Sequence, residues 1–269
     1  MPFTGSHPAA VLLLLRTPLP ASALVIGSMA PDTPYFVPFG MGPTHRPISV
    51  FTSDVLIGLA LWAAWHGWVS APAVAAAPAA LRRRLAGRVE LGLLRRLDRK
   101  LPLAPVALAV GAETHVLWDE FTHPGRFGSR HIAFLAGSWA GVPGTQWAQY
   151  LSGVLGITAL GLAAAHWWQR HPPAGLLPTP PPTPRPAAPP SRSPNPLPGL
   201  PPGLGRRTAQ LSWASVALVG MVVAVPAALD ATSPRGAAFN AVTHGVGAGA
   251  VTALLLAGVW RVFSGWRPG

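Results

Sequence analysis

The chain has 269 residues, of which 50% are apolar and only 10% are charged, and its mean hydropathy is +0.37. An average soluble domain is about 25% charged, so this composition argues against a water-soluble globular enzyme, and the long blocks of Leu, Ala and Val argue against disorder throughout. The net charge is +12 and cysteine is absent, which excludes disulfides, thiol catalysis and Cys-ligated metal sites.

The first 30 residues predict two short helices rather than a signal peptide. No Lys or Arg precedes the leucine run at 12–15, and Arg16 ends that run. Helices at about 8–15 and 20–30 are too short to cross a bilayer singly. We expect them to form a hairpin that enters from, or lies on, the outer side of the membrane. Pro31 and Pro34 end the second helix.

Five later blocks have the length and apolarity of membrane-spanning helices. A span needs about 20 mostly apolar residues, and four blocks meet this need well, at about 48–69, 146–168, 210–229 and 237–262. A fifth, at about 102–122, is long enough but carries Glu113, His115, Asp119 and Glu120. Their patterning fits a helix, and the Val and Ile runs typical of strands are few. The sequence therefore predicts an all-α, polytopic transmembrane protein with about five spanning helices and a short N-terminal helical hairpin.

A proline-rich stretch divides the chain. Residues 172–205 hold 15 of the 33 prolines, so this stretch cannot be helical or form a packed core. We expect three parts, namely an N-terminal membrane module with the site at 1–170, a disordered linker at 171–209 and a C-terminal helix pair at 210–269. A PxxP-type docking segment within the linker stays an alternative.

The basic residues predict the orientation in the membrane. Eight of the 20 Lys and Arg lie between 82 and 100, and loops rich in these residues stay on the cytoplasmic side. If the 81–100 loop and the proline-rich linker are inside, 15 basic residues are cytoplasmic and four are extracytoplasmic. This bias explains the positive charge without nucleic acid. We therefore expect a multi-pass protein of the plasma membrane, surrounded by lipid, with no nucleic-acid partner; the oligomeric state stays open.

Six ionisable residues fall on the predicted extracytoplasmic face, although the orientation argument used none of them: His7, Asp32, His45, His115, Asp119 and His123. Residues four apart share a helix face, so His115 and Asp119 can present an imidazole and a carboxylate to one ion. His123 stays on that face if the helix survives as far as Pro124. Such donors suit zinc, and also iron, manganese or nickel. We predict a divalent metal site, most simply for zinc, with one or two ions.

Plainer interpretations stand beside this prediction. Taken singly, each of these residues is as well explained by a hydrogen bond at the interface or by a helix end. Asn240 and His244, four apart in the last predicted span, favour an interhelical hydrogen bond. Glu113 and Glu120 point off the His115 face, although Glu120 could act as a catalytic base or support a ligand.

Three motifs resemble those of a family of uncharacterised bacterial multi-pass membrane proteins. They are MPFTGSHPAA at 1–10, ALVIGSMAPD at 23–32 and THVLWDEFTHP at 114–124. The resemblance covers roughly residues 1–170, and the tail after residue 205 does not share it. It implies a membrane protein and brings no established activity.

A more distant resemblance concerns the order His, Asp, His, then His-x-x-x-Asp and a further His. This order is similar to that of membrane-bound metal-dependent hydrolases and of the zinc-dependent phospholipase C and single-strand nuclease fold. The resemblance implies that all six residues are metal ligands. The soluble enzymes also carry a later His-x-x-x-Glu pair, which this sequence lacks, because Phe134 and Leu135 follow His131. One or two ions are therefore expected rather than three.

The resulting expectation is a membrane hydrolase that acts on a lipid or envelope ester or phosphoester at the extracytoplasmic face. Metal-activated water would be the nucleophile. The first alternative is a non-catalytic scaffold with a structural metal or polar cluster. The second is a transporter or proton relay that uses Glu113, His115, Asp119 and His244. An open coordination position beside a cleft would favour the hydrolase, a closed ligand set the scaffold, and a polar path to the inner side the transporter.

Overall fold

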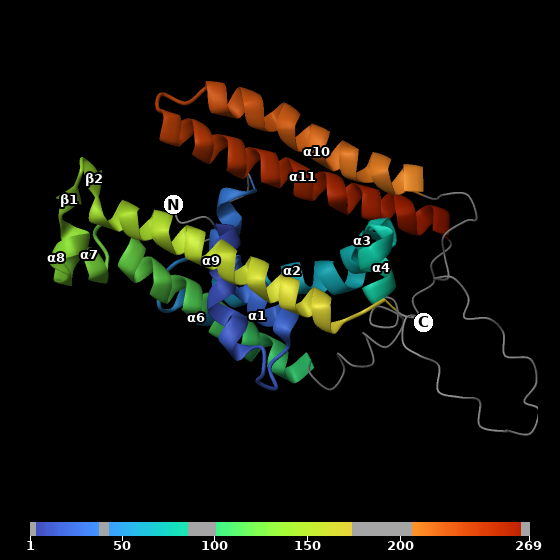
Figure 1. Cartoon of the computed structure of the whole chain (residues 1–269), viewed down its shortest axis with the longest axis horizontal. Coiled ribbons are helices and arrows are strands. Elements are labelled where there is room, and N and C mark those ends of the chain that lie inside the picture. The colour runs from blue at the N-terminus through green and yellow to red at the C-terminus, as the bar shows by residue number, and fades with distance from the viewer. Residues whose placement is uncertain (1–3, 38–42, 86–100, 174–205, 265–269) are drawn as a thin grey trace, which may run out of the picture.

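The computed structural model describes residues 4–37, 43–85, 101–173 and 206–264 of the chain. Within these ranges it is built of helices and one two-stranded hairpin (Figure 1). Five helical stretches are long and apolar enough to cross a membrane, namely Ser49–Ala76, Leu101–His131, Gly144–Arg170, Leu211–Leu229 and Pro234–Val262. The predicted all-α class and the five predicted spans are confirmed. Most of the basic loop, at 86–100, and of the proline-rich linker, at 174–205, lies outside the described residues.

The N-terminal segment forms three short pieces instead of two helices. They are the 3₁₀ helix η1, the α-helix α1 and the 3₁₀ turn η2, with bounds Thr4–Leu14, Ala21–Gly27 and Ala30–Tyr35. The structure forms the expected short hairpin from η1 and α1. The 3₁₀ turn η2, which follows α1, was not predicted. Pro31 and Pro34 lie inside η2, where their fixed φ suits a tight turn but not a longer α-helix.

The first span is interrupted twice. It consists of the turn η3, the helix α2, the π-helical turn η4 and the helix α3, with bounds Ser49–Phe51, Ser53–Ala64, Trp65–Val69 and Ser70–Ala76. It therefore runs seven residues beyond the predicted end, and α4 follows at Ala79–Leu85. The π-helical turn frees carbonyl groups, and the Arg261 guanidinium donates to two of them, at 2.7 Å to Gly67 and 3.1 Å to Trp68. The last helix of the chain thus supports the first span.

The second and third spans are joined by small elements. The turn η5 (Leu101–Leu103) leads into α6 (Ala104–Thr122), and after α6 come α7, α8, β1, β2 and α9, with bounds Phe127–His131, Ala133–Ala136, Ser138–Trp139, Val142–Pro143 and Gly144–Arg170. The strands pair antiparallel, with Ser138 opposite Pro143. Both residues of their tight turn, Ala140 and Gly141, have positive φ, as a type I′ turn requires.

The C-terminal helices α10 (Arg206–Leu229) and α11 (Pro234–Ser264) pack closely along their length. A Cβ atom added at Gly220 would lie 3.0 Å from the carbonyl oxygen of Gly245, so the pair depends on small residues. His244 Nδ1 instead donates to the carbonyl of Asn240 in its own helix, at 2.9 Å. The hydrogen bond observed at His244 therefore lies within α11 and is not the expected bond between helices, because the Asn240 carbonyl is one turn away on the same helix.

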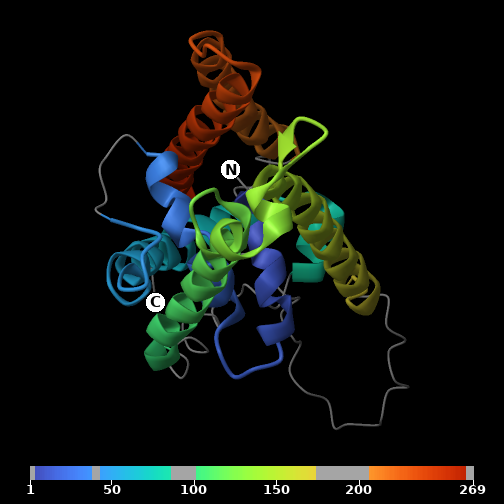
Figure 2. The same ribbon diagram turned by 90° about the vertical axis from the view of Figure 1, so that its left-hand side faces the viewer.

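The N-terminal segment lies among the spanning helices. Figures 1 and 2 show the α10–α11 pair along one side of the molecule; η1 packs between α6 and α9, and α1 packs against α6 and α2. A cluster of buried apolar side chains joins η1, α1, α2 and α6, namely Val11, Ala23, Leu24, Trp62, Ala104, Ala107 and Leu108. Helices α1 and α6 touch through backbone, because a Cβ at Gly27 or Gly111 would lie 2.3 Å from a carbonyl oxygen of the other helix. This contact fixes η2, which follows α1, against α6.

Candidate metal site

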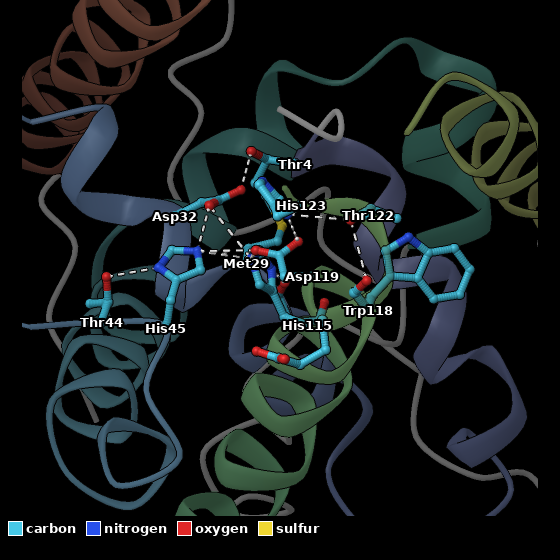
Figure 3. A network of polar contacts seen from close by, with 12 residues as sticks. Thr4, Met29, Asp32, Thr44, His45, His115, Trp118, Asp119, Thr122 and His123 are labelled. Carbon is cyan, nitrogen blue, oxygen red and sulfur yellow. Dashed lines mark hydrogen bonds and ion pairs between the residues drawn. The ribbon is translucent and has the colours of Figure 1, made fainter. Parts of the chain in front are cut away.

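The six predicted site residues come together beside the C-terminal half of α6. His7 comes from η1, Asp32 from η2 and His45 from the segment before η3, while α6 and its C-cap supply His115, Asp119 and His123. Figure 3 labels the last five of these six residues. His115 and Asp119 are one helical turn apart and both are buried. The predicted convergence is therefore present in the structure, while the role of these residues as ligands stays a prediction.

Two imidazole nitrogens and two carboxylate oxygens form the centre of the cluster. His45 Nε2 lies 3.1 Å from Asp32 Oδ1 and 3.5 Å from Asp119 Oδ2. His115 Nε2 lies 3.5 Å from each of the same two oxygens and 3.3 Å from His45 Nε2. Four ligands placed tetrahedrally at about 2.0–2.1 Å from a zinc ion lie roughly 3.3–3.4 Å from one another. These five separations are close to that spacing, while Asp32 and Asp119 belong to different three-residue groups of donor atoms that both contain His115.

The tautomer of His115 leaves a lone pair at this centre. Its Nδ1 lies 2.8 Å from the carbonyl oxygen of Ser28, which can only accept, so Nδ1 carries the proton. In the neutral ring Nε2 is then an acceptor, and it faces two carboxylate oxygens that are also acceptors. Such a group of atoms needs a cation between them, either protons or a metal ion. A backbone carbonyl that fixes the far nitrogen is the usual arrangement for a metal-ligating histidine.

His7 adds a further nitrogen. Its ring stacks on that of His115 with 3.8 Å between centroids, and its buried Nε2 has no hydrogen-bond partner among the described residues. Burial, together with the neighbouring His115, lowers the pKa of His7 to about 4, so this imidazole is neutral at pH 7. The donor atoms form two groups, and within each group all atoms lie within 4.8 Å of one another. One group consists of His7, His115 and Asp119, and the other of Asp32, His45 and His115.

Asp32 is held in its ionised form. Burial alone would raise the pKa of its carboxyl group, but hydrogen bonds from His115 and His45 outweigh burial and hold the pKa well below its ordinary value. The Thr4 hydroxyl donates to the second oxygen, Oδ2, at 2.5 Å. Nothing in the sequence alone singles out Thr4, although this residue stands three positions before His7 in the first motif.

Replacing Thr4 with valine should weaken divalent metal binding by roughly 10–100-fold, as the loss of a hydrogen bond to a ligand usually does. The substitution keeps the shape of the side chain but removes the donor to Asp32. Equilibrium dialysis against zinc measures the effect. Thr33→Val is the matched control, because the Thr33 hydroxyl only reaches the carbonyl of Met29, at 3.5 Å. Equal affinity for the two variants would contradict a supporting role for Thr4.

The helix does not continue to His123, yet this residue still reaches the cluster. Helix α6 ends at Thr122, and His123 has an extended backbone because Pro124 follows. His123 Nδ1 nevertheless lies 3.3 Å from Asp119 Oδ1, and its side chain is 28% exposed. His123 is therefore the member of the α6 group that solvent reaches most easily.

Glu120 lies outside the cluster but is connected to it. Its two oxygens accept from Arg126 Nη1 at 2.9 Å and from the amide of Phe127 at 3.0 Å. Arg126 Nη1 also donates to the carbonyl of His45, at 3.3 Å. With both oxygens engaged, Glu120 is poorly placed to act as a base. These contacts favour the alternative, in which Glu120 supports a ligand, here through Arg126 and the backbone of His45.

An open-sided apolar cavity of about 510 Å³ lies along the face of α6 that carries Trp118 and Phe121. It is formed by η1, α6 and α9 and is lined by residues that include Ala10, Leu117, Trp118, Phe121, Leu151 and Leu155. Three hydroxyl groups also line it, and each donates to a carbonyl of its own helix: Thr114 to Gly111, Thr122 to Trp118, and Ser152 to Gln149. The cavity therefore offers none of these hydroxyl protons to a ligand. Thr122, at one end, directly precedes His123.

Comparisons with known proteins identify a family but no activity. No curated protein and no solved structure matches the chain. One family model, described as a domain of unknown function, matches residues 1–261. The family match therefore extends beyond residue 170, where the resemblance was predicted to end. It includes α10 and most of α11, so the prediction that the tail after residue 205 lies outside the family was wrong. The chain belongs to this family, DUF4184.

Proposed function

We propose that the protein is a membrane-embedded, metal-dependent hydrolase that acts on a lipid or envelope ester or phosphoester at the extracytoplasmic face. One or two divalent ions, with zinc as the preferred ion, would be held by His7, Asp32, His45, His115, Asp119 and His123. The observation that carries the proposal is the meeting of two imidazole nitrogens with two carboxylate oxygens in a buried place, where each nitrogen lies 3.1–3.5 Å from both oxygens. A divalent ion bound there would take the place of the protons that the imidazoles otherwise share with the carboxylates.

The donor set fits a zinc-like ion in its chemistry. Imidazole nitrogens and carboxylate oxygens are ordinary zinc ligands, and the two carboxylates Asp32 and Asp119 balance the charge of a divalent ion, which lessens the cost of burying it. When bound, such an ion lowers the pKa of a coordinated water and polarises an ester or phosphoryl oxygen. Among the proposed ligands, His123 lies at the exposed edge, where a substrate would approach the bound ion.

The apolar cavity along α6 supports a lipid as the substrate class. Its walls belong largely to α6 and α9, two of the stretches apolar enough to span a membrane, so the cavity is continuous with surfaces that would face lipid chains. Because its hydroxyl groups are bonded to their own helices, a hydrocarbon chain suits it better than a polar ligand. We propose that one acyl chain lies there, with the scissile bond directed past Thr122 toward His123.

The placement of basic residues supports the proposed orientation. Figure 1 shows α4 and the C-terminal ends of α9 and α11 at one end of the molecule, and α7, α8 and the β-hairpin at the other. The first end carries Arg82, Arg83, Arg84, Arg170 and Arg261. The site lies toward the opposite end, since α6 runs to α7. If Lys- and Arg-rich ends are cytoplasmic, the site is extracytoplasmic.

One observation favours the alternative of a non-catalytic scaffold with a structural metal. If His45, His115, Asp32 and Asp119 all bind one ion, that ion is four-coordinate and has no open position, as structural zinc sites have. His7 Nε2 and His123 Nδ1 lie beyond these four, so the donor set is larger than a closed tetrahedron needs. Catalysis requires that one position be left to water, and the experiment below distinguishes the two cases.

Metal analysis and turnover together test the proposal. The detergent-purified protein should contain at least one divalent ion per chain. It should hydrolyse lipid in phospholipid vesicles, or p-nitrophenyl esters and bis-p-nitrophenyl phosphate. A chelator should abolish this activity, and zinc should restore it. Bound metal without turnover of any of these substrates would support the scaffold, and protein without metal would contradict both candidates.

Filling the cavity tests the acyl-chain proposal. Leu151→Trp should raise KM several-fold for a long-chain lipid ester and leave KM for a short-chain ester unchanged, because only the long chain needs the cavity. Leu162→Trp is the matched control, since Leu162 is an exposed residue of the same helix outside the cavity. Equal effects of Leu151→Trp on both esters would show that the acyl chain lies elsewhere.

A further inference from the structure

Asp54 is a buried carboxyl group that the proposed reaction does not use. It lies in the first turn of α2 and is 0% exposed. Its Oδ2 lies 2.7 Å from the Ser49 hydroxyl, and its Oδ1 has no hydrogen-bond partner in the described part of the chain. An ionised carboxylate here would have one bare oxygen and a single neutral donor on the other, which is an unfavourable setting for a buried charge. The setting favours the protonated acid.

The hydrogen bonds around Ser49 lead to the same protonation state. Ser49 Oγ has three neighbours at hydrogen-bond distance, the amide of Arg46 at 2.9 Å, the carbonyl of Arg46 at 2.8 Å and Asp54 Oδ2 at 2.7 Å. A hydroxyl has one proton and two lone pairs. If Asp54 is ionised, that proton can serve only one of the two acceptors. If Asp54 is protonated, it donates to Ser49, which donates to the Arg46 carbonyl and accepts from the Arg46 amide, so all three contacts are hydrogen bonds.

This network ends next to His45, whose backbone needs support. His45 has φ of 62°, in the left-handed region that side-chain-bearing residues rarely adopt. Such a conformation persists only where the surroundings fix it. On its C-terminal side, the amide of Arg46 is bonded to Ser49, and the carbonyl of His45 itself accepts from Arg126, at 3.3 Å. The Asp54–Ser49 pair therefore holds one of the two peptides that flank His45.

We infer that Asp54 is an uncharged positioning residue, which locks the Arg46–Ser49 turn and so keeps His45 Nε2 at the centre of the site. His45 and His115 are the titratable groups that act electrostatically on Asp54. With a divalent ion between the carboxylates of Asp32 and Asp119, the site as a whole has no net charge that would require a negative Asp54. The α2 N-terminus favours a negative charge only modestly.

Infrared difference spectroscopy of the metal-free protein tests the protonation state without relying on the proposed function. Wild type should show the C=O stretching band of a buried carboxylic acid, and this band should vanish in Asp54→Asn and in Asp54→Ala. Hydrogen exchange of a 43–52 peptide should quicken in Asp54→Ala and Ser49→Ala. It should stay unchanged in Asp54→Asn, because the Asn amide can donate to Ser49 as the acid does. A missing band, or an Asn variant that exchanges as fast as the Ala variant, would overturn the inference.

Cobalt titration then tests the effect on the site, and this step does rest on the proposed metal centre. Asp54→Asn should bind Co²⁺ within about threefold of wild type, whereas Asp54→Ala and Ser49→Ala should bind at least about tenfold more weakly. Thr52→Val is the matched control, since that exposed hydroxyl only reaches the carbonyl of Ile48. Wild-type protein that binds no Co²⁺ would contradict the metal proposal and leave the infrared and exchange results to decide the role of Asp54.

Discussion

Asp119→Ala is expected to remove bound metal from the purified protein, with a loss of affinity greater than the roughly 10–100-fold that follows loss of an outer hydrogen bond. The Asp119 carboxylate contacts three imidazoles of the cluster, so its removal affects more of the site than the loss of one outer hydrogen bond does. Its Oδ2 lies 3.5 Å from both His45 Nε2 and His115 Nε2, and its Oδ1 lies 3.3 Å from His123 Nδ1. Its removal leaves three imidazoles with one fewer negative charge, so the site both loses a ligand and becomes less attractive to a cation. Metal content by elemental analysis measures the effect.

Two further variants separate loss of metal from loss of fold. Glu113→Ala also removes a carboxylate from α6, but from an exposed position off the buried face, and should leave the metal content unchanged. Asp119→Asn keeps the shape of the side chain and should lose metal nearly as fully as the alanine variant. If Asp119→Ala retains its metal, or if Glu113→Ala loses metal equally, the cluster is not the metal site.

The spans could be predicted from the sequence because the forces that decide them are local. A bilayer requires about 20 apolar residues in a helix wherever they occur, and all five blocks are found. The interior of the first span could not be predicted, since two carbonyls of the π-helical turn at 65–69 accept hydrogen bonds from Arg261, almost 200 positions away. The hydropathy of residues 65–69 does not indicate that Arg261 contacts them.

The ionisable residues of the candidate site could be predicted from the sequence, but the residues that hydrogen-bond to them could not. His115 and Asp119 share a helix face by spacing alone, and the predicted orientation puts the other four residues on the same side of the membrane. Thr4, Ser28 and Ser49 carry no such signal, because a hydroxyl or a carbonyl becomes important only when tertiary structure brings it to a ligand. The supporting hydrogen bonds span up to 87 positions, as that between Ser28 and His115 does.

Gly111→Ala is expected to destabilise the protein by about 3 kcal/mol or more, at the upper end of the cost of overpacking, which corresponds to a fall in Tm of roughly 6–12 °C. The added Cβ would lie 2.3 Å from the carbonyl oxygen of Leu24 and 2.7 Å from the amide of Ser28, and a backbone atom cannot move aside as a side chain can. Gly153→Ala is the matched control, since nothing lies within 4 Å of a Cβ there, and it should gain up to about 1 kcal/mol from helix propensity.

The same variant should also weaken metal binding, although residue 111 touches no predicted ligand. The clash pushes α1 away from α6 at Ser28, whose carbonyl fixes the tautomer of His115, and α1 leads directly into η2, which carries Asp32. A change confined to packing would lower Tm and leave the zinc affinity of the folded fraction intact. Dialysis below the transition temperature distinguishes these results. A stable Gly111→Ala protein would contradict the close contact of α1 with α6, on which the convergence of the six residues depends.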